Sequence, residues 1–374
     1  MKIAIDATNI KAGGGLTHLK RIIEYFDLGT DTIVLIGGSW LNTIEAQKNV
    51  QKVILENEFQ SIIKQELFKA FKLKKYLKGA DIAFIPGGTF SNRKVRYVSM
   101  SQNMLVFENK ERNRFPKSFT WLRYLLLERL QVRSFKNAEG IIYISEYAKN
   151  YIENKYPELK NKKSTVIYHG ISDDFRQVPK EQKPIETYTR NAPFKLLYVS
   201  IVNYYKHQWN VIDAVKKLRS RGYNITLELI GPLYEPLRRK FETALIGTED
   251  YIFYKGRVAY DEISASYKNA DMFIFASTCE NMPNILVEAM SAGLPILCSN
   301  FGPMPEILKD AGVYMDPTSV DSISANLEKI LVNKENRQEI AQKAYTYSLE
   351  FSWKKTANET FDFIKEIIPV QNKT

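Results

Sequence analysis

Short apolar runs alternate with amphipathic stretches along most of the chain. Each run is short enough to be a buried strand, and the stretches between the runs are long enough to be helices. Strands that alternate with helices favour a parallel sheet with helices on both faces. In the first half of the chain the runs cover residues 2–5, 32–37, 82–85, 97–100 and 140–144.

The alternation is interrupted by a polar, proline-containing stretch at residues 173–193 and resumes at Phe194. A chain of 374 residues is long enough to bury two separate cores. We therefore predict an α/β protein with two Rossmann-like, doubly wound domains, residues 1–172 and 194–352, joined by a linker at 173–193. A final helix is predicted at 353–369 from three apolar residues at helical spacing, Phe361, Ile364 and Ile368.

Ligands of open α/β sheets bind in the crevice at the carboxyl ends of the strands. Three segments follow predicted strands directly: the glycine-rich turn at 12–15, which precedes a helix predicted to begin at Thr17, residues 200–206, and the loop that contains Glu280. Glycines let a backbone approach a ligand closely, although many glycine turns are only structural. We expect the three segments to face one cleft between the domains.

Residues 277–295 are the most informative stretch for function, and they hold two carboxylates, Glu280 and Glu288. A buried strand is predicted just before it, and Pro283 suits the first turn of a helix that Gly293 would end. Glu280 then lies in the strand-to-helix loop, and Glu288 lies inside the helix. The N–H groups at that helix start would attract an anion such as a diphosphate, whereas the carboxylates would bind hydroxyls. A nucleotide-sugar offers both.

This pattern resembles the family-four retaining glycosyltransferases, which have the GT-B fold. The resemblance is specific over roughly residues 195–320 and looser before them. Its landmarks, in the family's order, are residues 198–200 with Lys206, then 227–231, 253–256, 267–271, 301–306 and 312–317. The resemblance implies two Rossmann-like domains facing an interdomain cleft, with the last helix packing back on the N-terminal domain. It also implies retaining, metal-independent transfer of a hexose-type sugar.

The resemblance assigns three residues to the reacting centre. Lys206 would neutralise the departing diphosphate, and Glu280 would meet the transferred sugar. Gln102 stands where many family members carry a histidine near the sugar, and glutamine transfers no proton at neutral pH. This fits a mechanism in which an oxygen of the diphosphate takes the acceptor's proton. The alternatives are a surface lysine for Lys206 and a helix-capping carboxylate for Glu280.

The resemblance also assigns residues to donor binding. Glu288 would accept hydrogen bonds from the ribose hydroxyls, the alternative being a solvated helix glutamate. An arginine that usually accompanies the lysine is Ile201 here, so Ser200 or Asn203 would have to donate to the diphosphate instead. The other expected donor-binding residues are Gly14, Gly15, Asn203, Gly256, Val258, Asn281, Met282, Pro283, Asn284 and Ile285.

No other chemistry is indicated. The chain has three histidines, His18, His169 and His207, and no Cys/His/carboxylate cluster with metal-ligand spacing, so we expect no metal and no cofactor. His169 resembles a structural hinge residue, and His207 is a weak candidate for a phosphate contact. Two cysteines, the absence of a signal peptide and the absence of a long apolar stretch favour a cytoplasmic protein.

The charge is uneven. Residues 1–180 hold 30 Lys and Arg against 18 Asp and Glu, a net charge of +12, and the remainder has a net charge of −1. No nucleic-acid-binding module is recognised, so an anionic membrane surface or a lipid-diphosphate acceptor fits this charge better.

Two helices predicted at 61–79 and 119–137 combine basic and apolar residues, which suits peripheral binding to the inner face of the cell membrane. The alternative is a pair of core-packed helices with solvated lysines. Their basic residues are Lys64, Lys69, Lys72, Lys75 and Lys78, then Arg123, Arg129, Arg133 and Lys136. Their apolar residues are Ile62, Ile63, Leu67, Phe68 and Phe71, then Trp121, Leu122, Leu125 and Leu126.

The leading hypothesis is a retaining glycosyltransferase that uses a UDP- or GDP-sugar. Its acceptor would be a hydroxyl of a growing, lipid-linked bacterial surface polysaccharide, such as a lipopolysaccharide or a capsule. One alternative is a nucleotide-sugar epimerase, although Gln102 supplies no acid or base for it. The other is a catalytically inactive GT-B binding subunit, which Ile201 favours and which the intact Lys206, Glu280 and Glu288 oppose.

Overall fold

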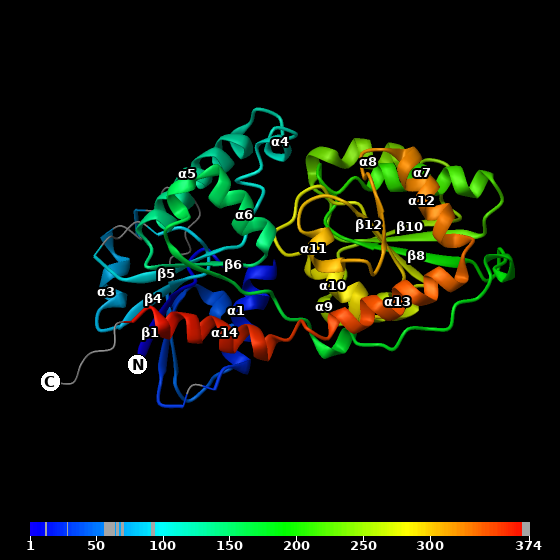
Figure 1. Cartoon of the computed structure of the whole chain (residues 1–374). Helices are drawn as coiled ribbons and strands as arrows, with labels where there is room; N and C mark the ends of the chain where they lie inside the picture. The colour runs from blue at the N-terminus through cyan, green and yellow to red at the C-terminus, as the bar shows by residue number, and fades with distance from the viewer. Residues whose placement is uncertain are drawn as a thin grey trace. The chain divides into compact units, whose positions relative to one another are not determined.

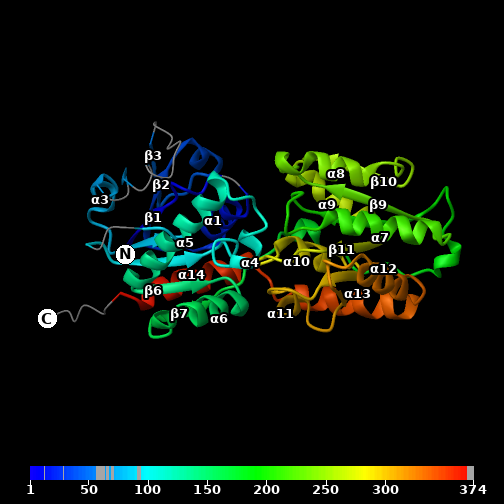
Figure 2. The same ribbon diagram turned by 90° about the horizontal axis from the view of Figure 1, so that it is seen from above.

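A computed structural model describes residues 1–11, 13–27, 29–55, 64, 67–68, 71–90 and 94–368 (Figures 1 and 2). The chain divides into two compact units. Unit 1 contains Met1–Arg112, Pro116–Gly170 and Ser352–Thr374, and unit 2 contains Asn113–Phe115 and Ile171–Phe351. Each unit is built on its own parallel sheet, as the alternation of apolar and amphipathic segments predicts.

Unit 1 has a seven-stranded sheet in the order β3-β2-β1-β4-β5-β6-β7 within the described residues. Its strands are β1 (Lys2–Asp6), β2 (Thr32–Gly37), β3 (Val50–Ile54), β4 (Ile82–Ile85), β5 (Tyr97–Ser101), β6 (Gly140–Tyr143) and β7 (Lys163–Val166). Its helices are α1 (Gly13–Tyr25), α3 (Leu73–Leu77), α4 (Asn109–Arg112), α5 (Phe119–Asn137), α6 (Glu146–Lys155) and α14 (Trp353–Glu366). All neighbouring strands are parallel, and the strand order reverses between β1 and β4.

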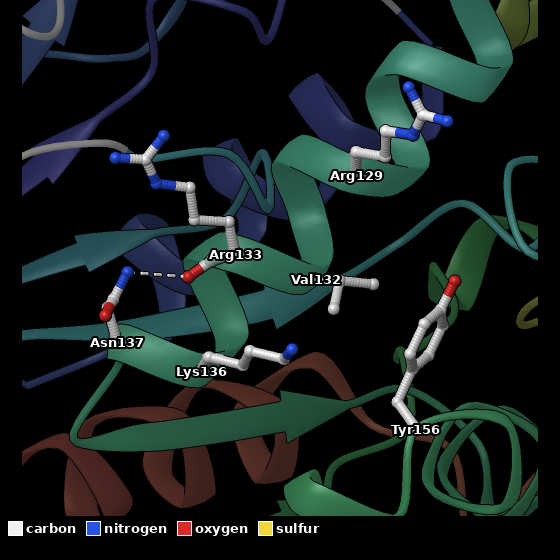
Figure 3. A pocket seen from close by; sticks show the side chains of 6 residues that line it. All are labelled: Arg129, Val132, Arg133, Lys136, Asn137 and Tyr156. Carbon is white, nitrogen blue, oxygen red and sulfur yellow. Dashed lines mark hydrogen bonds between the residues drawn. The ribbon is translucent and has the colours of Figure 1, made fainter.

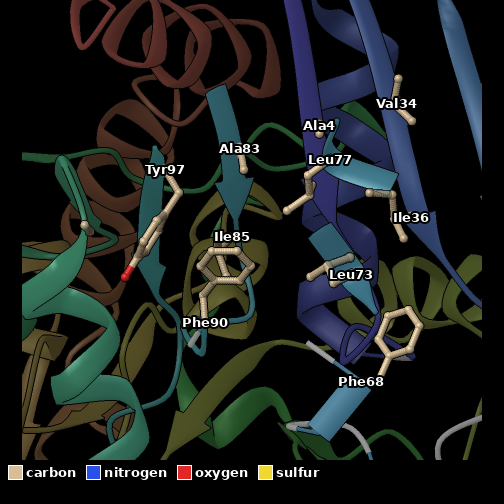
Figure 4. Close-up of a cluster of buried hydrophobic side chains, with 11 residues drawn as sticks. Ala4, Val34, Ile36, Phe68, Leu73, Leu77, Ala83, Ile85, Phe90 and Tyr97 are labelled. Atoms are coloured by element: carbon tan, nitrogen blue, oxygen red, sulfur yellow. The ribbon is translucent and has the colours of Figure 1, made fainter. Parts of the chain in front are cut away.

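The two basic helices predicted from the sequence cover one face of this sheet. Leu73 and Leu77 of α3 pack into a buried cluster with alternate residues of the central strands (Figure 4). Tyr97 belongs to the same cluster, and its hydroxyl donates to the carbonyl oxygen of Ser134 in α5, at 2.6 Å. The prediction for 119–137 matches α5 at both ends. Of the predicted helix at 61–79, α3 covers Leu73–Leu77, whereas Ile62, Ile63 and Lys69 lie outside the described residues.

Helices α1 and α14 pack against each other in unit 1 (Figure 1). The rings of Phe26 and Phe361 are stacked with their centroids 4.0 Å apart. The Thr356 hydroxyl donates to the carbonyl oxygen of Tyr168 at 2.7 Å, where the chain approaches Gly170. A Cβ on Gly170 would lie 2.1 Å from the backbone nitrogen of Trp353, so only glycine lets the two segments pass this closely. Helix α14 ends at Glu366, three residues before the predicted end.

Unit 2 has a six-stranded parallel sheet in the order β10-β9-β8-β11-β12-β13 within the described residues. Its strands are β8 (Phe194–Val199), β9 (Ile225–Ile230), β10 (Ile252–Gly256), β11 (Met272–Phe275), β12 (Ile296–Ser299) and β13 (Val313–Met315). Its helices are α7 (Gln208–Ser220), α8 (Arg238–Leu245), α9 (Tyr260–Asn269), α10 (Asn284–Ser291), α11 (Met304–Leu308), α12 (Val320–Leu331) and α13 (Lys334–Ser348). Counted along the unit, this is the 3-2-1-4-5-6 order of Rossmann folds, which bind ligands beside the first and fourth strands.

The stretch at 173–193, predicted to be a linker, is packed along unit 2. Lys180 donates to the carbonyl oxygen of Ala270 at 2.9 Å, and Arg337 donates to that of Lys183 at 2.6 Å. Unit 2 also includes Asn113–Phe115, which the sequence did not indicate. The Phe115 ring packs edge-on against Tyr204, with centroids 5.0 Å apart.

Replacing Phe361 with alanine should lower the free energy of unfolding of unit 1 by about 3–5 kcal/mol, because it removes a fully buried ring that stacks on Phe26. Phe119→Ala is the matched control, since the Phe119 side chain is 82% exposed in the same unit. Urea denaturation followed by tryptophan fluorescence measures both. Equal losses in the two variants would show that the packing of α1 on α14 does not hold unit 1 together.

Candidate functional site

The loops that follow β8 and β11 leave unit 2's sheet side by side. These strands are neighbours, and the strand order reverses between them. Two hydrogen bonds fix the loops: the Thr278 backbone N–H donates to the Tyr205 carbonyl oxygen at 2.8 Å, and the Tyr198 hydroxyl donates to that of Lys206 at 2.5 Å. The sheet topology therefore brings Lys206 and Glu280 to one place although 74 residues separate them.

Lys206 and Glu280 form an ion pair, in which the Lys206 ammonium donates to Oε1 of Glu280. Lys206 is almost fully buried, and its Nζ lies 5.2 Å from the ring centroids of both Tyr205 and Phe275. A buried ammonium without an anion would be costly, so Glu280 stabilises it. The burial and the pairing exclude the interpretation of Lys206 as one more surface lysine.

The residues before Lys206 shape its loop. Oδ1 of Asn203 accepts from the Tyr204 backbone N–H at 2.8 Å, and the Asn203 carbonyl oxygen accepts from the Lys206 N–H at 3.0 Å. The Ser200 hydroxyl donates to the Ile201 carbonyl oxygen at 3.2 Å. Asn203 and Ser200 thus both bond to the loop's own backbone, and their contact with a diphosphate stays a prediction.

His207 follows Lys206 as the residue before α7, and its backbone is left-handed, with φ of 51°. Burial, together with the charges of Arg114 and Lys240, lowers the pKa of His207 to about 4. The ring is therefore neutral at pH 7, and its Nε2 lies 3.3 Å from the Thr278 hydroxyl. His207 offers no positive charge to a phosphate at neutral pH.

Glu288 is buried inside α10, which excludes the solvated alternative. The Tyr267 hydroxyl donates to Oε2 of Glu288 at 2.9 Å and also lies 3.2 Å from the Ile285 carbonyl oxygen. Burial raises the pKa of Glu288 to about 7, although the hydrogen bond from Tyr267 opposes this rise. Tyr267 was not assigned a role from the sequence. The only signal for it is general: a buried tyrosine hydroxyl usually has a partner.

The other predicted donor-binding residues of unit 2 lie at the carboxyl edge of its sheet or just beyond it. Asn281, Met282 and Pro283 are buried between β11 and α10, and Asn284 and Ile285 begin that helix half-buried. The Asn284 N–H already donates to the Met282 carbonyl oxygen at 3.0 Å. Gly256 ends β10 in the left-handed region, with φ of 65°, and Val258 is half-buried two residues later.

The candidates in unit 1 also meet one another. A Cβ on Gly15 would lie 3.2 Å from Oε1 of Gln102, so that glycine leaves room for the amide. The Gln102 amide nitrogen donates to Sδ of Met100 at 3.1 Å and lies 3.5 Å from Nδ1 of His18. The His18 ring stacks on His169, with centroids 4.7 Å apart. Burial and the neighbouring His169 hold the pKa of His18 well below its usual value.

The glycine segment differs from its prediction. Helix α1 begins at Gly13, four residues before the predicted start at Thr17, so Gly14 and Gly15 belong to its first turn. Gly13 itself is left-handed, with φ of 69°. Glycine disfavours a helix by about 1 kcal/mol relative to alanine, and packing of the buried residues further along α1 outweighs this. That this segment shares a cleft with Lys206 stays a prediction.

The described residues show neither a metal-binding cluster nor a helix that could span a membrane. They contain no group of three or more His, Cys, Asp or Glu side chains that could hold a metal ion. None of their helices combines the length and the apolar character needed to cross a bilayer. The expectation that the protein needs no metal stays a prediction.

Part of the chain is similar in sequence to known glycosyltransferases. Residues 180–347 match the family model of the group 1 glycosyl transferases. The chain is 32% identical over 117 residues to the O-antigen chain mannosyltransferase B of Escherichia coli, covering 31% of each chain. It is 30% identical over 219 residues to the protein CapJ of Staphylococcus aureus, covering 58% of this chain and 52% of CapJ. The matches thus span about a third to about a half of the length of these relatives.

The whole chain matches solved structures. The Anabaena protein Alr3699/HepE, solved in complex with UDP-glucose, superposes with a TM-score of 0.74 at 17% identity, over 98% of this chain and 100% of that one. An identity this low shows the fold alone. The fold is that of GT-B glycosyltransferases, and residues 180–347 are similar in sequence to the group 1 glycosyl transferases.

Glu288 should make the stability of unit 2 depend on pH. Its ordinary pKa of 4.5 applies to the unfolded chain, whereas the native pKa is about 7. Between these values the unfolded chain loses the proton first, so the free energy of unfolding falls as pH rises, by about 3 kcal/mol in total. Chemical denaturation across this range, compared with Glu288→Gln, isolates the effect. Equal pH dependence in both proteins would contradict the raised pKa.

Proposed function

We propose that the protein is a retaining glycosyltransferase that moves a hexose-type sugar from a UDP- or GDP-sugar to a hydroxyl of a growing, lipid-linked bacterial surface polysaccharide. The observation that carries the proposal is the Lys206–Glu280 ion pair at the topological switch point of unit 2. Such a position holds the ligand in Rossmann-type sheets. Glu288 lies buried in the helix that begins four residues after Glu280.

The pair suits a nucleotide-sugar because each member has a partner in the donor. A diphosphate would compete with Glu280 for the Lys206 ammonium, and the released carboxylate would then accept hydrogen bonds from sugar hydroxyls. Negative charge grows on the diphosphate as the sugar leaves, so the ammonium stabilises the transition state more than the bound donor. The Glu288 carboxylate, oriented by Tyr267, would accept bonds from the ribose hydroxyls.

Glutamine at position 102 fits the proposed retention of configuration. Gln102 neither gives nor takes a proton at neutral pH, so no base in its place would deprotonate the acceptor. We propose that an oxygen of the departing diphosphate takes the proton from the acceptor hydroxyl, as the new bond forms on the face that the diphosphate leaves. Gln102 would then bind the sugar or the acceptor through its amide, which Gly15 leaves room for.

The relatives support the classes of donor and acceptor. One is named as a mannosyltransferase of O-antigen chains, and the Anabaena protein was solved with UDP-glucose.

For membrane binding the support is the surface of unit 1, which carries the excess positive charge. Phe71 is 78% exposed, and the exposed lysines beside it are Lys72, Lys74, Lys75 and Lys78. We propose that unit 1 binds the inner face of the cell membrane.

Lys206→Ala should lower kcat by about 100-fold or more, with a smaller change in KM for the donor, because the ammonium acts mainly in the transition state. Release of UDP or GDP in the presence of acceptor measures it. Lys217→Ala is the matched control, since Lys217 pairs with Asp321 at 2.6 Å elsewhere in unit 2. A Lys206→Ala enzyme that keeps half of the wild-type kcat contradicts the role, and a wild type that releases no nucleoside diphosphate favours an inactive binding subunit.

Replacing Lys72, Lys75 and Lys78 with glutamate should abolish sedimentation with anionic vesicles at low salt. Each basic residue near such a surface contributes about 1 kcal/mol, and salt screens this contribution. Lys69 lies outside the described residues and is left unchanged. The control replaces three exposed lysines of unit 2, Lys268, Lys329 and Lys334, and should bind like the wild type. Binding that is equally strong in both variants would show that this surface does not meet the membrane.

A further inference from the structure

Helix α5 has a pocket at its C-terminal half that no part of the proposed reaction uses. Its volume is about 330 Å³, and its lining residues are Arg129, Val132, Arg133, Lys136, Asn137 and Tyr156. Figure 3 shows the Lys136 side chain extending toward Tyr156, with Val132 on the helix face that looks toward the same ring. The pocket thus combines an apolar wall with a basic rim.

The basic rim has charge to offer to a ligand. In the described part of the chain no hydrogen bond or ion pair engages the side chain of Arg129 or Arg133, and both are exposed. Lys136 pairs with Glu158 at 2.7 Å, and both side chains are about half exposed. An exposed pair of this kind is weak and exchanges readily for another anion.

The nearest buried carboxylate does not cancel the charge of the rim. Glu128 accepts the Tyr156 hydroxyl at 2.8 Å, and it also accepts from Arg112 and Lys155, each at 2.5 Å. Arg112 and Lys155 therefore already neutralise Glu128, and its charge does not offset that of the basic residues in the pocket. Tyr156 is held in place by this network, so its ring forms a fixed wall.

The pocket continues an exposed stripe along α5. Phe119, Leu122 and Leu126 are 82%, 57% and 41% exposed. Arg129, Arg133 and Lys136 follow them at the same alternating spacing of three and four residues, which keeps all six on one face of a helix. The stripe is apolar in its first half and basic in its second. At 1.5 Å per residue the two halves are centred about 15 Å apart.

We propose that this pocket binds the phosphate of an anionic phospholipid headgroup while Phe119, Leu122 and Leu126 enter the membrane interface. The order of the stripe fits a helix that meets a bilayer obliquely, with its apolar end deeper and its basic end among the headgroups. Arginine guanidinium groups suit phosphate because they donate two parallel hydrogen bonds. The inference rests on the membrane binding proposed above and names the ligand and the residues for it.

The test measures binding to vesicles of phosphatidylcholine mixed with phosphatidylglycerol. The double variant Arg129→Glu/Arg133→Glu should bind at least about 30-fold more weakly, because each of the two lost arginines contributes about 1 kcal/mol at an anionic surface. Arg129→Lys/Arg133→Lys keeps the charge but loses the paired donors, and it should bind several-fold more weakly. The control, Lys354→Glu/Lys355→Glu, changes two exposed lysines of α14 in the same unit and should leave binding within twofold of the wild type. Thermal unfolding checks that each variant folds.

Three results would overturn the inference. If Arg129→Glu/Arg133→Glu binds no more weakly than the α14 control, the pocket is not the lipid site. If the lysine variant binds like the wild type, diffuse charge and not a phosphate pocket attracts the membrane. If glycerol 3-phosphate raises the unfolding temperature of the wild type but not of Arg129→Glu/Arg133→Glu, while both proteins bind the vesicles equally, the pocket takes a free phosphate ester and not a lipid. A wild-type protein that does not bind the vesicles at all contradicts the proposed membrane binding itself. The proposed glycosyl transfer is then tested separately, by the release of nucleoside diphosphate.

Discussion

The candidate site depends on a single electrostatic constraint: an ammonium that is buried must have an anion beside it. Lys206 is buried because its loop is bonded to the strand before it and to the loop after β11. Glu280 is the anion that this second loop supplies. Neither residue could hold its position alone, since removing one would leave a buried charge uncompensated. The same constraint lets a ligand break the pair, because an anion that binds the Lys206 ammonium more strongly than Glu280 does can replace the carboxylate.

The fold was largely predictable, because its signal is local. Buried parallel strands read as apolar runs, and α5 was identified over its whole length because its buried and exposed residues repeat with a helical period. The strands β3 and β7 gave no such signal. They lie at the two edges of unit 1's sheet and are half-exposed, so they contain polar residues such as Lys52, Lys163 and Ser164. The start of α1 was misplaced because glycine propensity argues against a helix that tertiary packing nevertheless forms.

The site was predictable only in part. The positions of Glu280 and Glu288 followed from the strand, the loop and the helix around them, which are local features. The bond between Tyr267 and Glu288 could not be read from the chain, because it joins residues of two helices that only the packed unit brings together. The same holds for the pocket on α5, whose wall, Tyr156, comes from the end of α6. The pairing of Lys206 with Glu280 needed the strand order, which alternation alone does not give.

The return of the chain to unit 1 has a consequence for synthesis. Unit 2 ends at Phe351, whereas unit 1 lacks α14 until the last segment of the described chain has been made. On the ribosome, unit 2 therefore has all its strands before unit 1 can cover Phe26 with Phe361. A nascent chain carries an open apolar face on α1 throughout the translation of residues 171–351. Premature termination before Trp353 would leave that face exposed, and exposed apolar surface makes an incomplete chain prone to aggregation.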